Sequence, residues 1–218
     1  MTPVGRAVAD LDLTYSGGYM YPPRPEIAVP IGSIGMYEQR GWIAQAKKNG
    51  TCTLLVVGPD GMVPYDRHGQ VQKLWRGPPP AMERRIRSAL PPGWSALVGE
   101  ALHSKVPGIR DTLYLFDVLA VGGRTLTGTR LSERLDALKL MFPGGETTPT
   151  HRDLGDGLLV ARSFKAGFRP LFDSIIGNPE DEGLVMKDPG ATLSNPFKEG
   201  SNAGWQAKCR KPTKNYSH

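Results

Sequence analysis

The chain has 218 residues, 39% of them hydrophobic and 22% charged, which is ordinary for a globular protein that can bury a core. Its 27 lysines and arginines exceed its 21 acidic residues, so a polyanionic partner is favoured over a merely solvated basic face. No apolar run approaches a membrane span, and no signal-peptide core is present. Two distant cysteines and four scattered histidines exclude a zinc site, so we expect a cytoplasmic protein.

The first 34 residues differ in composition from the rest of the chain. SGGYMYPPRPEIAVP (16–30) is dense in glycine and proline, which predicts extended, turn-rich backbone. We therefore expect residues 1–34 to form an extended segment packed on a single domain of residues 35–218. No internal repeat divides this domain.

Strand-like patterns begin near residue 42. WIAQAK (42–47) alternates in polarity, which turns Gln45 and Lys47 to one face of a strand. The Asn-Gly dipeptide at 49–50 predicts a β-hairpin with TCTLLVV (51–57), because both residues accept the positive φ of a type I′ turn.

The later elements mix strands with helices. The predicted helices are AMERRIRSAL (81–90), LSERLDALKLMF (131–142) and the shorter RPLFDSII (169–176). The predicted strands are MVPYD (62–66), WSALVGEAL (94–102), TLYLFDVLAV (112–121), DEGLVMK (181–187) and GWQAKCR (204–210). The continuously apolar TLYLFDVLAV is expected at the centre of the sheet. The fold class that follows is α+β with an antiparallel core.

Charged side chains gather at the ends of these strands. The set comprises Lys47, Arg67, Glu100, Glu182, Lys187, Lys208 and Arg210, with Phe116 inside an apolar strand. Several cations, a pair of carboxylates and an aromatic ring suit a nucleoside triphosphate with Mg²⁺.

The order of six short motifs resembles the adenylation (nucleotidyltransferase) domain of ATP-dependent DNA ligases, within the superfamily that includes RNA ligases and mRNA-capping enzymes. The motifs are KKNG (47–50) for K-x-D-G, YDRHG (65–69) for S-R-N-G, LVGEAL (97–102) for dGEl, LFDVL (115–119) for FDxL, EGLVMK (182–187) for EGhhhK, and WQAKCRK (205–211) for W-x-K-x-K. Each motif is weak alone, but together they span residues 42–211. The resemblance implies an antiparallel-sheet, ATP-grasp-like nucleotidyltransferase domain.

The resemblance implies three catalytic lysines. Lys47 matches the lysine that attacks the α-phosphate of ATP and becomes lysyl-AMP, and Lys48 points away. Lys187 and Lys208 match the lysines that bind the α-phosphate. A lysine must lose its proton to act as a nucleophile, and neighbouring cations favour the neutral form.

The remaining matches imply binding roles. Phe116 matches the ring that stacks on the purine, with a core phenylalanine as the alternative, and Gln45 matches a contact to the adenine edge. Glu100 matches the acid that holds the ribose, and Glu182 the acid near ribose and metal; both are implied Mg²⁺ ligands. Arg67 matches an arginine facing the nucleotide and the 5′-phosphate of the nucleic acid.

Arg210 is expected as a second nucleic-acid contact, whereas Asp117 and Trp205 are expected to be structural. Three letters depart from the family pattern. Asn49 replaces the aspartate of K-x-D-G, Cys52 stands where many members have an arginine, and Arg210 replaces a lysine.

The expected function is an ATP-dependent polynucleotide ligase, a monomer that seals nicked double-stranded DNA in a bacterial or phage-infected cell. With seven residues after Lys211, no C-terminal OB-fold domain is expected. An RNA ligase or a GTP-using capping enzyme is the alternative enzyme. A non-catalytic nucleic-acid-binding module of the same fold is the alternative from another class.

Overall fold

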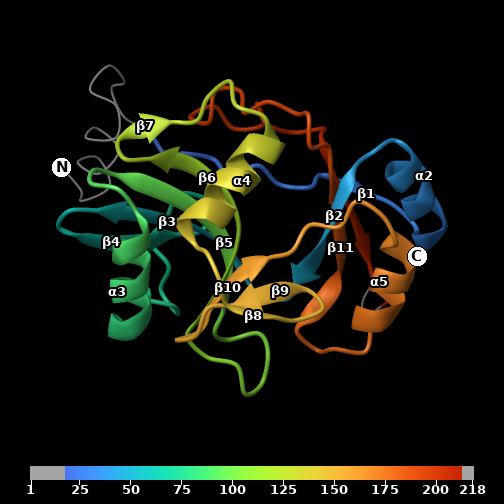
Figure 1. The fold of residues 1–218 in the computed structure, drawn as a ribbon, viewed down its shortest axis with the longest axis horizontal. Helices are drawn as coiled ribbons and strands as arrows, with labels where there is room; N and C mark the ends of the chain where they lie inside the picture. Colours follow the sequence, from blue (N-terminus) through green and yellow to red (C-terminus); the bar gives the residue numbers. More distant parts are fainter. Residues whose placement is uncertain (1–17, 213–218) are drawn as a thin grey trace.

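The structure is a computed structural model that describes residues 18–212, and it contains two β-sheets flanked by helices. Figure 1 shows the larger sheet with α3 and α4 beside it, and the smaller sheet with α2 and α5 on its outer side. The α+β class predicted from the sequence is confirmed. No helix in the described part of the chain is long and apolar enough to cross a membrane.

The larger sheet has eight strands. They are β3 (Thr51–Gly58), β4 (Gly61–Tyr65), β5 (Ser95–Leu102), β6 (Thr112–Val121), β7 (Arg124–Thr125), β8 (Glu146–Thr147), β9 (His151–Asp153) and β10 (Leu158–Ala161). Their order is β4-β3-β5-β6-β10-β9-β8, with β7 paired to β6. The apolar strand β6 is central, as predicted. Its pairing with β10 is parallel, so the expected antiparallel core is not uniform.

The smaller sheet has the order β1-β12-β11-β2. Its strands are β1 (Ile27–Ala28), β2 (Ile43–Lys48), β11 (Asp181–Lys187) and β12 (Gln206–Arg210). The pairs of β11 with β2 and with β12 are antiparallel, whereas β1 lies parallel to β12. This sheet therefore joins three of the six predicted motifs with a piece of the N-terminal segment.

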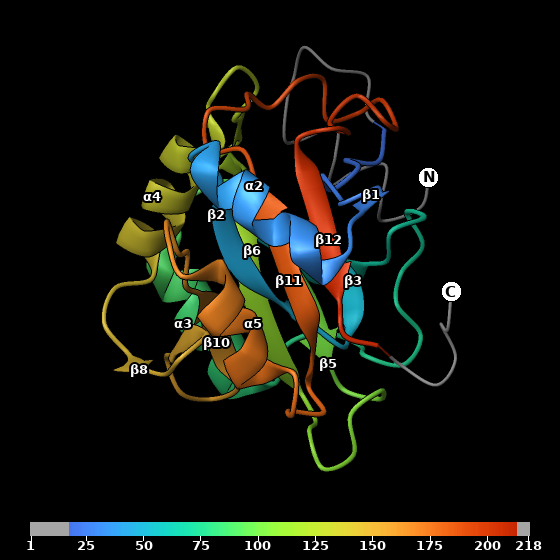
Figure 2. The same cartoon turned by 90° about the vertical axis from the view of Figure 1, so that its right-hand side faces the viewer.

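Within residues 18–212, four α-helices and one short 3₁₀ helix cover the sheets. They are η1 (Ile31–Ser33), α2 (Ile34–Gln39), α3 (Pro80–Ala89), α4 (Leu131–Met141) and α5 (Phe168–Ile175). The carboxylate of Glu38 accepts hydrogen bonds from the backbone N–H groups of Gly167 and Phe168, which caps the N-terminus of α5 and ties it to α2. Figure 2 shows these two helices side by side over β2, β11 and β12.

Three apolar clusters form the core. One lies between the larger sheet, α3 and α4, and includes Met82, Leu115 and Leu138. A second lies under α2 and α5 and includes Ala44 and Phe168. A third, on the other face of the larger sheet, includes Leu54, Val98 and Met20. Because Met20 is buried in this third cluster, part of the N-terminal segment packs into the core.

The predicted hairpin at Asn49-Gly50 is wrong. Strand β2 pairs with β11, whereas β3 pairs with β4 and β5, so the dipeptide connects two sheets. The Asn49 N–H donates to the carbonyl of Glu180, and Gly50 lacks the positive φ of a type I′ turn. Glycine is required at position 50 for space, because a Cβ there would lie 2.6 Å from the carbonyl oxygen of Ala101.

The N-terminal segment was expected to extend over residues 1–34. Residues 1–17 lie outside the described part of the chain, so the prediction for them is not addressed. Residues 18–30 are largely extended, with β1 within them, and η1 and α2 follow. The helices predicted at 81–90, 131–142 and 169–176 are confirmed within a few residues, whereas α2, β7, β8, β9 and β10 have no counterpart among the predictions.

A β-bulge in β11 directs the side chain of Glu182. In the pairing with β2, Asp181 lies opposite Lys48 and Gly183 opposite Lys47, so Glu182 is the extra residue. Gly183 has a φ of +140°, and a Cβ at this position would lie 2.0 Å from the carbonyl oxygen of Cys209. The bulge therefore requires glycine directly after Glu182.

We expect Gly183→Ala to lower the free energy of unfolding by about 2 kcal/mol or more, because β11 and β12 must separate and the backbone is strained. Gly177→Ala is the matched control, since a Cβ at Gly177 meets no atom within 4 Å, and its effect should stay within about 0.5 kcal/mol. Urea unfolding of both variants measures the difference. Equal stabilities would contradict the packing described for the bulge.

Candidate active site

A pocket of about 760 Å³ lies between the two sheets. Residues from β2, β11 and β12 line one side, residues from β3, β5 and β6 line the other, and Pro23–Glu26 close a third side. All nine residues predicted to bind or react line this pocket. They are Gln45, Lys47, Arg67, Glu100, Phe116, Glu182, Lys187, Lys208 and Arg210.

Lys47 and Lys48 lie on opposite faces of β2. Lys47 Nζ lies 2.5 Å from Glu182 Oε2 at the pocket wall, and the Lys47 side chain is 17% exposed. Lys48 Nζ instead forms ion pairs with Asp181 at 2.9 Å and Glu180 at 2.8 Å. The ammonium group of Lys48 also lies 5.6 Å from the centre of the Tyr114 ring. The alternation along β2 therefore directs the Lys47 ammonium group toward the pocket, while that of Lys48 is held in a separate buried ion-pair network.

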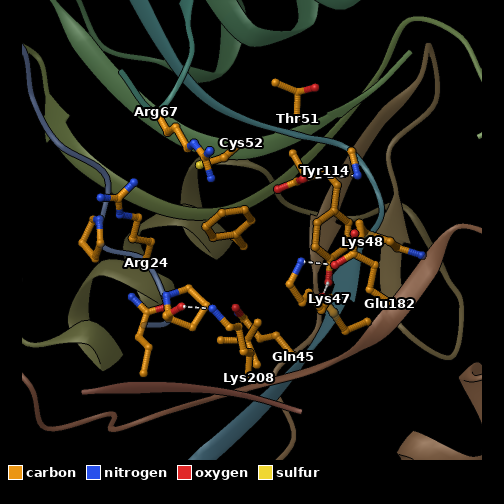
Figure 3. A pocket seen from close by; sticks show the side chains of 18 of the residues that line it. Arg24, Gln45, Lys47, Lys48, Thr51, Cys52, Arg67, Tyr114, Glu182 and Lys208 are labelled. Carbon is orange, nitrogen blue, oxygen red and sulfur yellow. Dashed lines mark hydrogen bonds and ion pairs between the residues drawn. The ribbon is translucent and has the colours of Figure 1, made fainter. Parts of the chain in front are cut away.

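Gln45 shares the pocket face of β2 with Lys47 (Figure 3). Its side chain is buried, and Nε2 donates to Ser163 Oγ at 3.0 Å. Oε1 has no hydrogen-bond partner among residues 18–212. A buried acceptor without a partner costs free energy, so this oxygen is suited to a donor on a bound molecule.

Phe116 and Lys187 form one wall of the pocket. Lys187 Nζ lies 4.5 Å from the centre of the Phe116 ring. Burial lowers the pKa of Lys187 to about 8, while the nearby carboxylate of Asp117 acts in the opposite direction. The predicted structural role of Asp117 agrees with its contacts, because it is buried and pairs with Arg134 through both carboxylate oxygens.

Two carboxylates border the space in front of Lys47. Burial raises the pKa of Glu100 to about 7, against the effects of Lys47 and Lys105, and Glu182 raises it further. The Gly50 N–H donates to Glu100 Oε1 at 3.2 Å. Glu100 and Glu182 line the same pocket, so the two carboxylates border common space.

Mg²⁺ is the metal implied by the resemblance. The residues 18–212 contain no group of three or more acidic, histidine or cysteine side chains that could enclose a metal. Magnesium is commonly held by one or two carboxylates together with substrate phosphates. Glu100 and Glu182 therefore fit a magnesium ion that arrives with a phosphate ligand.

The remaining predicted cations lie around the pocket edge. Lys208 Nζ donates to the carbonyl of Pro25 at 3.0 Å, and burial, followed by Arg210 and Lys47, lowers the pKa of Lys208. Arg210 Nε lies 3.4 Å from Glu182 Oε2. Arg67 is exposed, with Nε donating to His68 Nε2 at 3.0 Å.

Asn49, which replaces the aspartate of K-x-D-G, is not among the residues lining the pocket.

Three further residues at the site were not predicted from the sequence. Arg24 lines the pocket from the N-terminal segment, Ser163 holds Gln45, and Lys105 donates to the carbonyl of Gly50. None of them stands in a motif or at the end of a predicted strand. A charge or hydroxyl group brought in by tertiary contacts leaves no local pattern in the sequence.

No model of a known protein family and no curated protein matches this chain. Solved structures do match. A mycobacterial DNA ligase D complexed with ATP and MES aligns with 88% of this chain and 60% of its own, at a TM-score of 0.58 and 17% identity. The ligase domain of LigD from M. tuberculosis aligns with 88% of this chain and 59% of its own, at 0.55 and 17%.

A protein described as Pmar-Lig_PreS3 aligns with 85% of this chain and 46% of its own, at a TM-score of 0.56 and 15% identity. The chain thus spans about three fifths of the length of the two mycobacterial structures and 46% of the length of the third structure. At these identities the likeness concerns the fold alone. The chain has the fold of these DNA ligase domains, the family whose six motifs it resembles.

Proposed function

We propose that this chain is an ATP-dependent polynucleotide ligase that acts on nicked double-stranded DNA. The observation that carries the proposal is the position of Lys47 in a pocket that six other lysines and arginines line, besides the ion-paired Lys48, together with four carboxylates. An excess of cations around one nucleophilic side chain suits attack on a polyphosphate. The shared fold with a DNA ligase complexed with ATP supports the same substrate here.

The first step transfers AMP to the protein. Glu182 Oε2 is placed to accept the proton of the Lys47 ammonium group, since the two atoms are at hydrogen-bond distance. Lys47 Nζ then attacks the α-phosphorus of ATP; an N–P bond forms as the nitrogen loses a second proton to solvent, the bond to the β-phosphate oxygen breaks, and pyrophosphate leaves with that electron pair. Mg²⁺, when held by Glu100 and Glu182, would neutralise phosphate charge.

The second and third steps seal the nick. A 5′-phosphate oxygen attacks the phosphorus of lysyl-AMP, the N–P bond breaks, and Lys47 regains both protons. The 3′-hydroxyl then loses its proton to solvent and attacks the 5′-phosphorus; a phosphodiester bond forms, the bond from the 5′-phosphorus to the bridging oxygen breaks, and AMP leaves with that oxygen. Lys187 and Lys208 act in each step as fixed cations that stabilise the negative charge of the transition states.

The purine is selected by Gln45. Ser163 Oγ accepts from Nε2, which leaves the buried carbonyl oxygen Oε1 of this pocket-lining residue as the acceptor without a partner among residues 18–212. Adenine offers an amino donor on the edge where guanine offers a carbonyl acceptor. The pair Gln45–Ser163 therefore favours ATP over GTP, with the purine stacked on Phe116.

Incubation with ATP is expected to add the mass of one AMP to the wild-type protein. Lys47→Ala and Lys47→Arg should both abolish this adduct. The arginine variant should lose it even though arginine keeps the positive charge beside Glu182. Mass spectrometry with α-labelled ATP and, in parallel, α-labelled GTP measures the adduct. A wild-type protein without the adduct, or an alanine variant with it, would contradict the mechanism.

The purified adduct is expected to seal nicked DNA faster than nicked RNA. Gel analysis of both duplexes, each with a 5′-phosphate at the nick, measures the preference. Release of AMP on nicked RNA alone would make this chain an RNA ligase. No sealing of either duplex would limit the activity to nucleotide transfer.

Ser163→Ala and Gln45→Leu should each reduce the preference for ATP over GTP by about three- to tenfold, which corresponds to one hydrogen bond. Gln39→Leu is the control, since Gln39 is exposed at the end of α2. The second-order rate constant of adduct formation with each nucleotide measures the preference. An unchanged ratio in both pocket variants would rule out Gln45 as the selecting group.

The rate of adduct formation should depend on the charge of Lys187. Its pKa of about 8 lies below the usual range, so the free protein loses this positive charge as pH rises through 8. The second-order rate constant should then fall above pH 8 in the wild type. In Lys187→Arg the fall should be absent, because arginine stays charged; a wild-type rate that keeps rising to pH 9.5 (about 1.5 units higher) contradicts the assignment.

A further inference from the structure

Residues 19–28, here called the strap, are attached to the domain at both ends. The Tyr19 hydroxyl donates to the carbonyl of Asp66 at 2.6 Å, and the Tyr21 N–H donates to the carbonyl of Pro196 at 2.7 Å. At the other end, β1 pairs with β12, and Lys208 Nζ donates to the carbonyl of Pro25. The middle of the strap therefore has a defined position along the pocket.

Arg24 lies in this middle part, flanked by Pro23 and Pro25, which fix their own φ angles. Arg24, Arg67 and Cys52 line the active-site pocket together, and they also line a smaller hollow beside it. Figure 3 shows Arg24 and Arg67 approaching the region of Cys52 from different segments. Both arginines lower the pKa of the Cys52 thiol, which burial raises to about 12.

The charges around this part of the pocket are unbalanced. Arg210, Lys47 and Arg24 act to lower the pKa of Lys208 and only Glu26 acts to raise it, and all of these side chains line the pocket. Arg24 Nη2 pairs with Glu199 Oε1 at 3.0 Å, but both side chains are substantially exposed. Exposed ion pairs contribute little, and a guanidinium group carries five N–H donors. The arrangement suits an anion that approaches two arginines at once.

We propose that Arg24 binds a phosphate group in the pocket together with Arg67. This inference rests on the proposed function, which supplies two sources of that chemistry: the phosphates of ATP and the 5′-phosphate of the nick. Cys52 is short and carries no charge at its raised pKa, so it leaves room between the two guanidinium groups. The strap thereby supplies a charge to the side of the pocket where position 52 has none.

A purely structural role for Arg24 makes a different prediction. If Arg24 acted only by tying the strap to Glu199, then Glu199→Gln would have the same effect as Arg24→Gln. If Arg24 binds phosphate, only the loss of the guanidinium group matters. Arg169→Ala is the control for loss of an exposed arginine from an ion pair, since Arg169 pairs with Asp173 on α5, outside the pocket.

The experiment compares these variants in two separate steps. The first is the rate of adduct formation with ATP, and the second is the rate of AMP release from purified adduct on a nicked duplex with a 5′-phosphate. Arg24→Gln should slow one of the steps by about 10- to 100-fold, as expected for a lost charge-assisted hydrogen bond. Glu199→Gln and Arg169→Ala should stay within about twofold of wild type.

The step affected identifies the phosphate. Slow adduct formation with normal AMP release assigns Arg24 to the phosphates of ATP, and the reverse assigns it to the 5′-phosphate of the nick. Wild-type rates in both steps, or an equal loss in Glu199→Gln, overturn the proposal. Melting temperatures of all variants exclude loss of the fold as the cause.

A binding measurement keeps this inference separable from the ligase activity. In Lys47→Ala, which cannot form the adduct, the Kd is measured for ATP and for nicked duplexes with a 5′-phosphate or a 5′-hydroxyl. Adding Arg24→Gln should weaken ATP binding or remove the preference for the 5′-phosphate by about tenfold or more. If the Kd for ATP and the preference for the 5′-phosphate duplex both stay unchanged, the role of Arg24 is overturned, whether or not the wild type forms an adduct.

Discussion

The buried ion pair between Lys48 and Asp181 holds the register of β2 against β11, and the positions of Gln45 and Lys47 on the pocket face depend on that register. Both side chains are 0% exposed, with Lys48 Nζ 2.9 Å from Asp181 Oδ1. Breaking such a pair leaves a buried charge without compensation, at a cost of about 3–5 kcal/mol. A shift by one residue would exchange the faces of Lys47 and Lys48 and place the wrong lysine in the pocket. The second lysine of KKNG thus holds the first in place.

A second buried pair supports the opposite wall of the pocket. Asp117 and Arg134 join β6 to α4 through two hydrogen bonds of 2.9 and 3.0 Å. The guanidinium group of Arg134 also lies 5.6 Å from the centre of the Trp205 ring, near the start of β12. Phe116 is the extra residue of a β-bulge in the pairing of β6 with β5, directly beside Asp117, so fixing Asp117 also holds the backbone at Phe116. The same carboxylate favours the charged form of Lys187, although burial opposes it.

Much of the site could be predicted from the sequence because its residues stand on strands with regular alternation. Gln45 and Lys47 are two residues apart on β2, as are Lys208 and Arg210 on β12, so a strand places each pair on one face. The helices α3 and α4 followed from apolar spacing in the same way. These predictions depend on local periodicity, which tertiary contacts seldom overturn.

The errors and omissions concern contacts between distant segments. Asn49-Gly50 has the local signature of a hairpin, yet β2 finds its partner in β11, more than 130 residues later in the chain. Long-range pairing depends on burial and sheet order, which a dipeptide does not encode. Contacts between distant segments bring Ser163 to Gln45 and Arg24 to the pocket, and β10 pairs in parallel with β6 in the same way.

The strap has a consequence for how such a site is recognised in sequences. A motif is a set of letters at fixed spacing, and by that measure Cys52 is a loss. The structure places positive charge beside Cys52 from Arg24, which precedes Lys47 by more than 20 residues and belongs to no motif. A positive charge can reach the same place in the pocket from a different segment of the chain, but a sequence alignment compares only residues at equivalent positions. A pocket of this kind can keep its electrostatic field while its motif letters change, so distant members of a fold can escape detection by sequence.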